Sequence, residues 1–197
     1  SSEIQLADNL TDTFQPAAGG TFTDVPATHW AAGAVEFVTS QGLLQGTGTS
    51  TFAPGQPMTR AMLVTALWRE AGSPVVNYAM DFDDVDEDQW YTEAVRWAVS
   101  KGIVAGTGKG FSPDAALPRE SLAAILFRYA GGQVSADDLS GYADGAVVSA
   151  WAREAMNWAV AQGLITGKSG GRLDPGGTAS RAEVSAILMR YVQSAQA

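Results

Sequence analysis

The feature that most constrains the fold is a motif that occurs three times along the 197 residues. An aspartate, a tryptophan, two glycines and two arginines return in the same order. The leading positions are Asp24, Asp84 and Asp144, each followed by a tryptophan at Trp30, Trp90 and Trp151. Self-similarity of this kind indicates one supersecondary unit copied in tandem, with neighbouring copies sharing a core. A ligand site is then expected once per unit or once per junction, which favours binding over catalysis.

Each unit is predicted to hold two helices joined by a glycine-rich loop. The first helix is expected to have its N-cap two residues before the tryptophan, at Thr28, Asp88 and Ser149. It is expected to end at a C′ glycine, at Gly42, Gly102 and Gly163. The loop then carries Gly46, Gly106 and Gly167, and the second helix begins at Arg60, Arg119 and Arg181. Ser180 and Glu183 form the pattern of a capping box. With at most a short strand per unit, the fold class is mainly α.

Charge and composition narrow the classes of partner. The formal net charge of −9 repels nucleic acid and anionic lipid, so an anionic ligand must be held by local cationic groups. Six of the nine arginines occupy two repeated positions. These are Arg60, Arg119 and Arg181, and nine residues further on Arg69, Arg128 and Arg190. The chain has no cysteine, which excludes disulfides and thiolate metal sites.

The joint pattern resembles the S-layer homology (SLH) domain. The matching motifs are an aromatic-x-Asp-Val opening, a Trp-Ala helix start, a Gly-Leu/Ile-x-x-Gly loop, a Phe-x-Pro turn and a Thr-Arg-Ala-Glu helix start. They cover residues 22–192. Two departures stand out, since Met62 and Ser121 replace the acid that the third unit keeps at Glu183. The resemblance implies a pseudo-threefold, three-pronged assembly of three helix-loop-helix repeats around a central helical bundle.

The predicted boundaries place one repeat in each third of the chain. They are an N-terminal lead-in or linker at 1–21, repeats at 22–76, 77–138 and 139–193, and a polar tail at 194–197.

The resemblance also implies a function. It indicates a non-enzymatic module, without a cofactor, that anchors an exported protein non-covalently at the surface of a Gram-positive-type bacterium. The family's usual ligand is a secondary cell-wall polysaccharide carrying pyruvylated N-acetylmannosamine, held in grooves between neighbouring units. Other surface-layer proteins are possible partners, while nucleic acid and membranes are not expected. A second interpretation is a protein–protein or self-assembly module, which would bind without polysaccharide, and a third is an exported enzyme with an unfamiliar carboxylate site.

The ligand-binding candidates are four sets of equivalent residues. Arg60, Arg119 and Arg181 can hold a carboxylate bidentately; alternatively they pair with aspartates of a neighbouring unit. Asp24, Asp84 and Asp144 can accept sugar hydroxyls or serve as turn caps. Trp30, Trp90 and Trp151 can stack on a sugar or join the core, whereas the aromatics seven residues on (Phe37, Trp97 and Trp158) are expected to be core. Gly46, Gly106 and Gly167 can let backbone amides approach a ligand or supply positive φ. Arg69, Arg128 and Arg190 are expected to bind C-terminal carbonyls or carboxylates of other units.

Three other patterns point to no further site. Lys168 and Ser169 imitate a phosphate-binding loop, but one residue is missing between its glycines. The acidic stretch 81–88 imitates a calcium loop, yet Gln89 and Val95 stand at its sixth and twelfth positions, which leaves only weak calcium binding open. His29 is the only histidine, so neither a zinc site nor a catalytic triad is expected. No catalytic residue and no metal ligand are therefore predicted.

Overall fold

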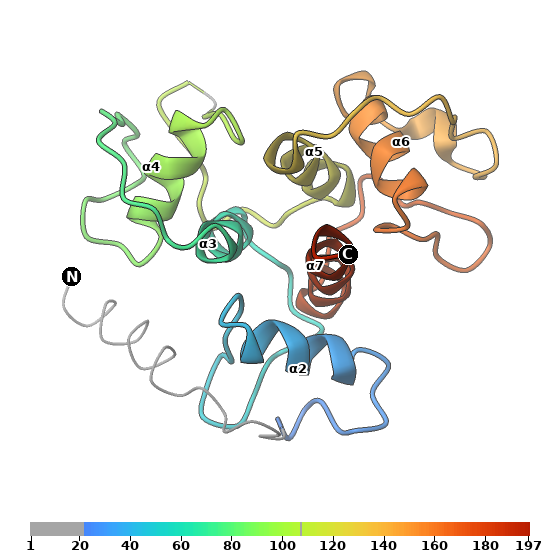
Figure 1. The fold of residues 1–197 in the computed structure, drawn as a ribbon, viewed down its shortest axis with the longest axis horizontal. Helices are drawn as coiled ribbons and strands as arrows, with labels where there is room; N and C mark the ends of the chain where they lie inside the picture. The colour runs from blue at the N-terminus through green and yellow to red at the C-terminus, as the bar shows by residue number, and fades with distance from the viewer. Residues whose placement is uncertain (1–21, 107) are drawn as a thin grey trace.

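The computed structural model describes residues 22–106 and 108–197, which fold into α-helices joined by irregular loops (Figure 1). The helices are α2 (Ala32–Ser40), α3 (Arg60–Glu70), α4 (Thr92–Ser100), α5 (Arg119–Ala130), α6 (Arg153–Ala161) and α7 (Arg181–Ala195). Two 3₁₀ turns, η1 (Gly145–Val147) and η2 (Ala150–Ala152), precede α6. Pairing between extended segments is limited, in the described residues, to isolated bridges. The mainly α class is confirmed; the lead-in or linker predicted at 1–21 lies outside the described residues.

The helices pair across the repeats rather than within them. The first helix of a repeat packs against the second helix of the repeat before it, so α4 contacts α3 and α6 contacts α5. The pattern closes on itself, because α2 of the first repeat contacts α7 of the third (Figure 1). The central helices are therefore α3, α5 and α7. The three-pronged outline and the exact repeat boundaries stay predictions.

A ring of backbone hydrogen bonds joins the three segments that lead into the central helices. The Met58 amide donates to the Ala179 carbonyl, Ala179 donates to Leu117, and Leu117 donates back to Met58, each over 2.9 Å. Because each of the three residues both donates and accepts, their buried backbone groups are satisfied without a sheet. The ring fixes the starting points of all three central helices relative to one another.

Local signals explain where most helices begin and end. Ser180 Oγ accepts from the Glu183 amide over 3.1 Å, and Thr59 Oγ1 accepts from the Met62 amide over 3.1 Å, as N-caps do. The predicted C′ glycines follow α2, α4 and α6 in the left-handed region, where only glycine is free of strain. They are Gly42, Gly102 and Gly163, with φ of 71°, 70° and 71°.

The N-caps predicted for the first helices are wrong. Thr28 and Asp88 lie within turns, in the first of which His29 donates to the Pro26 carbonyl, and α2 begins only at Ala32. Ser149 starts the 3₁₀ turn η2, and its hydroxyl donates to Glu120 on α5 instead of capping a helix. The tryptophan that follows each of these residues therefore sits in a turn before the helix.

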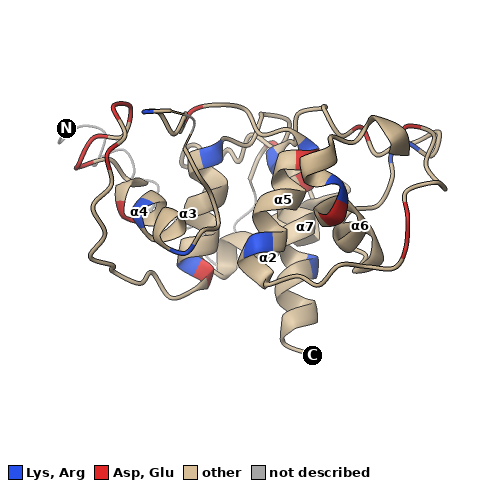
Figure 2. Ribbon diagram, turned by 90° about the horizontal axis from the view of Figure 1, so that it is seen from above, with Lys and Arg blue, Asp and Glu red and all other residues tan. Residues whose placement is uncertain are grey.

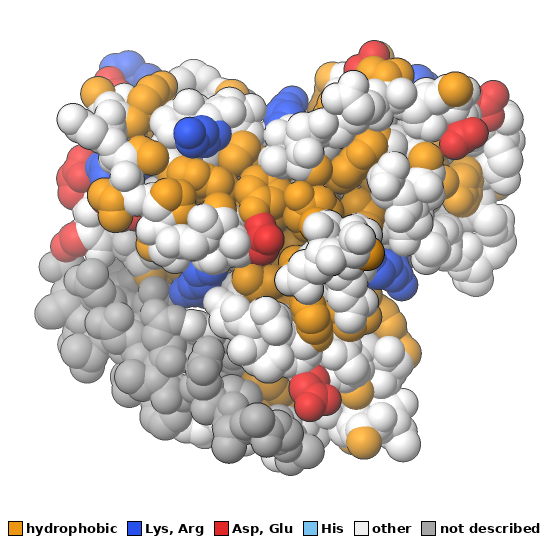
Figure 3. Space-filling view, viewed as in Figure 1, with side chains coloured by type: hydrophobic (Ala, Val, Ile, Leu, Met, Phe, Trp, Pro, Cys, Tyr) orange, Lys and Arg blue, Asp and Glu red, His pale blue; other side chains and the backbone are white. Residues whose placement is uncertain are grey.

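The core lies between the central helices and their partners. The central helices bury leucine or valine at positions four residues apart, which face the same side of a helix. These are Leu63 and Leu67 on α3, Leu122 and Leu126 on α5, and Val184 and Leu188 on α7, all at most 1% exposed. Hydrophobic side chains also gather at the centre of the face shown in Figure 3. Each fully buried side chain of this size contributes about 1.5–3 kcal/mol.

Candidate functional site

The first arginine of each central helix reaches into the next repeat. Arg60 Nε donates to the Phe111 carbonyl over 3.0 Å, and Arg119 Nε donates to the Leu173 carbonyl over 2.7 Å. Arg181 Nε closes the circle by donating to the Phe52 carbonyl of the first repeat over 2.9 Å. The predicted alternative, pairing with the aspartates of a neighbouring unit, is wrong. The Nε atoms donate to carbonyls, and the carboxylate that pairs with one of these arginines among the described residues is Glu183.

The three arginines nevertheless have different surroundings. Arg119 is 4% exposed and forms an ion pair with Glu183 over 2.8 Å. Arg181 is 3% exposed, and its other nitrogens donate to the Gln45 carbonyl over 2.5 Å and to the weakly accepting Met62 sulfur over 3.5 Å. Burial lowers the pKa of Arg181 to about 10, so its guanidinium stays protonated at neutral pH.

Arg60 is more accessible than its two equivalents. Its Nη2 donates to the Ala105 carbonyl over 3.3 Å, and its guanidinium lies 4.7 Å from the centre of the Phe111 ring. Burial lowers the pKa of Arg60, and the positive charge of Arg128 lowers it further. The two arginines come from the first and second repeats and donate to the carbonyls of Ala105 and Ile103, so this junction holds two cations near one another.

The three aspartates bind the backbone at the end of the glycine loop. Asp84 accepts from the amides of Phe111 and Ser112, each over 2.8 Å. Asp24 and Asp144 make the equivalent pairs of bonds, to Phe52 and Ala53 and to Leu173 and Asp174. The second residue of each pair has positive φ, between 53° and 61°, although none is glycine. Each aspartate thus stabilises a strained turn, as the alternative turn role predicts.

Hydrogen bonding governs the ionisation of two of these carboxyls. Desolvation acts to raise the pKa of Asp84, but the amides of Phe111 and Ser112 lower it overall because they stabilise the carboxylate. Asp144 has a lowered pKa for the same reason, with a further contribution from Arg172, whose Nε lies 3.9 Å from Asp144 Oδ2.

The loop glycines are required by a close approach rather than by positive φ. None of Gly46, Gly106 and Gly167 is left-handed, so the positive φ proposed for them is wrong. A Cβ on Gly46 would lie 2.7 Å from both a Phe22 ring carbon and the Thr51 carbonyl oxygen. Phe82 and Tyr142 approach the other two glycines in the same way. The aromatic residue that opens each repeat therefore packs on its own loop.

The repeated tryptophans differ in exposure. Trp30 is 67% exposed and Trp151 is 60% exposed, whereas Trp90 is partly buried against Tyr91. The aromatics seven residues on are core as predicted: Trp97 and Trp158 are buried, and Phe37 packs against the core. Two wide indole faces are thus available to solvent at equivalent positions.

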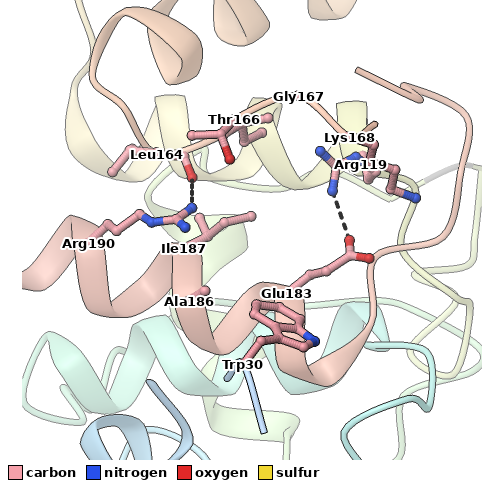
Figure 4. A pocket seen from close by; sticks show the side chains of 11 residues that line it. Trp30, Arg119, Leu164, Thr166, Gly167, Lys168, Glu183, Ala186, Ile187 and Arg190 are labelled. Atoms are coloured by element: carbon pink, nitrogen blue, oxygen red, sulfur yellow. Dashed lines mark hydrogen bonds and ion pairs between the residues drawn. The ribbon is translucent and has the colours of Figure 1, made fainter. Parts of the chain in front are cut away.

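A pocket of about 240 Å³ lies beside α7, which we call the α7 pocket (Figure 4). It brings together three of the predicted site residues, and each comes from a different repeat: Trp30, Arg119 and Gly167. The remaining lining residues belong to the third repeat: Leu164, Ile165, Thr166, Lys168, Glu183, Ala186, Ile187 and Arg190. Neither the predicted aspartates nor Arg60 and Arg181 line it. The pocket is a junction site, since no single repeat could form it.

Sequence reasoning missed several residues that shape this pocket. Glu183 was read as a helix-capping residue, but its carboxylate turns to Arg119, 64 positions away in the chain (Figure 4). Lys168 forms an ion pair with Asp174 over 2.7 Å. Arg190 Nη1 donates to the Leu164 carbonyl over 3.0 Å, and Arg128 contacts Ile103 in the same way. These arginines bind carbonyls, as expected, but in the loop after the first helix of their own repeat.

Figure 2 shows the wider distribution of charge: basic residues lie mainly on the helices, and acidic residues mainly in the peripheral loops. Across residues 22–106 and 108–197, no three His, Cys, Asp or Glu side chains come together as a set of metal ligands. No helix in the same residues is long and apolar enough to cross a membrane.

The fold defines a tandem-repeat module, and the α7 pocket lies at a junction between its repeats. The family model described as the S-layer homology domain matches residues 21–61, 81–123 and 141–185, and the chain belongs to this family.

The relatives are much longer proteins, and this chain spans a quarter or less of the length of each of the two described here. The chain is 28% identical over 176 residues to the S-layer protein sap of Bacillus anthracis, covering 88% of this chain and 21% of that protein. It is 29% identical over 175 residues to an amylopullulanase of Thermoanaerobacterium thermosulfurigenes, covering 85% of this chain and 9% of that enzyme. S-layer proteins among the relatives favour a non-enzymatic module, although glycosidases share the same region.

One solved structure is similar to this chain in part. It is an undecaheme cytochrome from the S-layer of Carboxydothermus ferrireducens, at 26% identity and a TM-score of 0.37, covering 70% of this chain and 21% of that one. This score is too low to carry an argument.

Proposed function

We propose that this chain is a non-covalent anchoring module at the bacterial cell surface, which binds an anionic, pyruvylated secondary cell-wall polysaccharide at the junctions between its repeats. Membership of the S-layer homology family and the S-layer proteins among its relatives support the surface location. The single observation that carries the ligand class is the composition of the α7 pocket, because it combines an exposed indole with cationic groups.

The pocket suits a sugar residue for physical reasons. Its volume of about 240 Å³ is close to the lower end of small-molecule sites, about 300 Å³. The indole of Trp30 offers a flat apolar face, which can cover the C–H side of a pyranose ring, and its N–H can donate to a hydroxyl. Arg190, which also lines the pocket and donates to the Leu164 carbonyl, adds positive charge for a carboxylate.

Weak single sites are sufficient for anchoring. A wall polysaccharide repeats its sugar units, so several sites on one module can bind one polymer. Once the first site is occupied, the second binding event is intramolecular and has a high effective concentration. A module with one site at each junction fits this mode of attachment.

Co-sedimentation with purified cell-wall sacculi tests the proposal. The wild-type chain is compared on intact sacculi, on sacculi stripped of secondary polysaccharide, and on sacculi from which only the ketal pyruvate has been removed. We expect binding to intact sacculi alone, with a loss in Trp30→Ala and none in Val75→Ala, since Val75 is 83% exposed and does not line the α7 pocket. Equal binding to stripped sacculi would contradict the proposal and favour the self-assembly interpretation.

A further inference from the structure

The three repeats carry different charges at equivalent positions. On α7 the third position of the helix is Glu183, which neutralises Arg119. On α3 the equivalent residue is Met62, whose sulfur accepts from Arg181. On α5 it is Ser121, whose counterpart arginine, by the equivalence of the repeats, is Arg60. A cation matched by a carboxylate has little attraction left for an anionic ligand, whereas an unmatched cation keeps it.

The junction between the first and second repeats holds two arginines without a matching acid. Among the described residues neither Arg60 nor Arg128 forms an ion pair with a carboxylate. Arg60 donates to the carbonyls of Phe111 and Ala105, and Arg128 donates to the carbonyl of Ile103, two positions before Ala105. Two like charges held near one another raise the free energy of the unliganded protein, and a bound anion would relieve this repulsion.

The exposed Trp151 lies in a turn that packs against α5, the helix that carries Arg128. The turn η2, which contains it, packs against α5, and Ser149 donates to Glu120 over 2.9 Å from its amide and over 2.7 Å from its hydroxyl. Trp151 thereby occupies, relative to α5, the position that Trp30 occupies relative to α7. We call Arg60, Ser121, Arg128 and Trp151 the α5 site.

We propose that the α5 site is the preferred binding site for the anionic group of the ligand, and that the α7 pocket binds sugar with less dependence on its charge. This inference rests on the proposed function and adds to it a ranking of the sites. The third junction ranks below both, because its tryptophan, Trp90, is partly buried against the core and Tyr91, and because Arg181 already contacts two carbonyls and the Met62 sulfur.

The tryptophan indole signals in a two-dimensional NMR titration report on the two sites separately, once Trp151→Phe and Trp30→Phe have assigned them. The probes are the methyl glycoside of 4,6-pyruvylated N-acetylmannosamine and the same glycoside without the ketal. We expect the Trp151 signal to respond to the anionic probe at an about tenfold lower concentration than the Trp30 signal. The neutral probe should show no such preference.

Charge-matched variants test the cause. Ser121→Glu places on α5 the acid that α7 already has, and should weaken binding of the anionic probe at Trp151 about tenfold. Ser121→Gln is the uncharged control of the same size and should change it by less than about twofold. Glu183→Gln should make the Trp30 signal respond to the anionic probe at lower concentration.

The outcomes separate this inference from the function on which it rests. A Trp30 signal that saturates first, or a Ser121→Glu titration identical to that of Ser121→Gln, overturns the ranking while the polysaccharide function stands. If no indole signal responds to the anionic probe and sacculus binding ignores the ketal, both the ranking and the proposed function are overturned.

Discussion

The second and third repeats place the same residue types on equivalent backbone, yet their junctions have different electrostatics. Arg119 is buried and ion-paired with Glu183, whereas Arg60 contacts carbonyls and lies near a second cation. One substitution within the repeat, glutamate or serine at the third position of the central helix, accounts for the difference. Equivalent positions in a repeat protein can therefore share their geometry while one stabilises the fold and the other remains available to a ligand.

The largest expected effect concerns the two arginines themselves. Arg119→Ala leaves the Glu183 carboxylate without its partner and should lower the free energy of unfolding by about 3 kcal/mol. Arg60→Ala removes only carbonyl contacts and should cost about 1 kcal/mol. Urea denaturation monitored by circular dichroism measures both.

A double variant serves as the control for this pair. Arg119→Met combined with Glu183→Leu removes both charges and should recover much of the lost stability. Equal losses in the two single variants would show that the ion pair does not distinguish the junctions.

The loop glycines of the second and third repeats differ in how tightly their surroundings pack against them. In the second repeat a Cβ on Gly106 would meet the Phe82 ring and lie 2.7 Å from the Gly110 carbonyl oxygen. In the third repeat a Cβ on Gly167 would lie 3.0 Å from the Tyr142 ring and 3.3 Å from the Arg172 carbonyl oxygen. Gly106→Ala should therefore cost about 2 kcal/mol and Gly167→Ala about 1 kcal/mol. Thermal unfolding measures both costs. Small and equal losses in the two variants would contradict the prediction and show that the loops rearrange to accept the methyl group.

The smallest expected effect comes from the aspartates and depends on pH. The folded-state pKa of Asp84 lies below its unfolded value, so the carboxylate stabilises the fold above about pH 4. This contribution is lost as the pH falls through the folded pKa. Asp84→Asn retains one acceptor oxygen of two and should cost about 1 kcal/mol at pH 7 and much less near pH 2.

The matched variant Asp144→Asn should behave alike but with a small additional dependence on salt, because Arg172 lies 3.9 Å from that carboxylate. Unfolding midpoints measured from pH 2 to 7 at low and high salt would test this. A variant whose deficit stays constant with pH would contradict the assigned role of the carboxylate.

Sequence reasoning was reliable where the signal is local. The mainly α class, the glycines Gly42, Gly102 and Gly163 and the cap at Ser180 follow from rules that involve a few neighbouring residues. It failed for the first helices, since a turn between Thr28 and Ala32 competes with the expected cap.

Contacts between repeats could not be predicted in the same way. Nothing near Glu183 in the chain indicates that it pairs with Arg119, or that Arg181 reaches the loop at Phe52, 129 positions away. The repeat suggested sites at junctions, but it could not show which residues of which copies would meet, because that depends on how the three units close upon one another.

The hydrogen-bond ring of Met58, Leu117 and Ala179 also bears on how such a module folds and how it can be divided. In a linear repeat array each unit touches only its neighbours, so a terminal copy can be removed while the others survive. Here the first and last repeats are also neighbours, and each packed pair of helices consists of one helix from each of two repeats. Removing any one repeat would therefore leave one helix in each of the two remaining repeats without its packing partner. We therefore expect the three repeats to unfold together, in one cooperative transition.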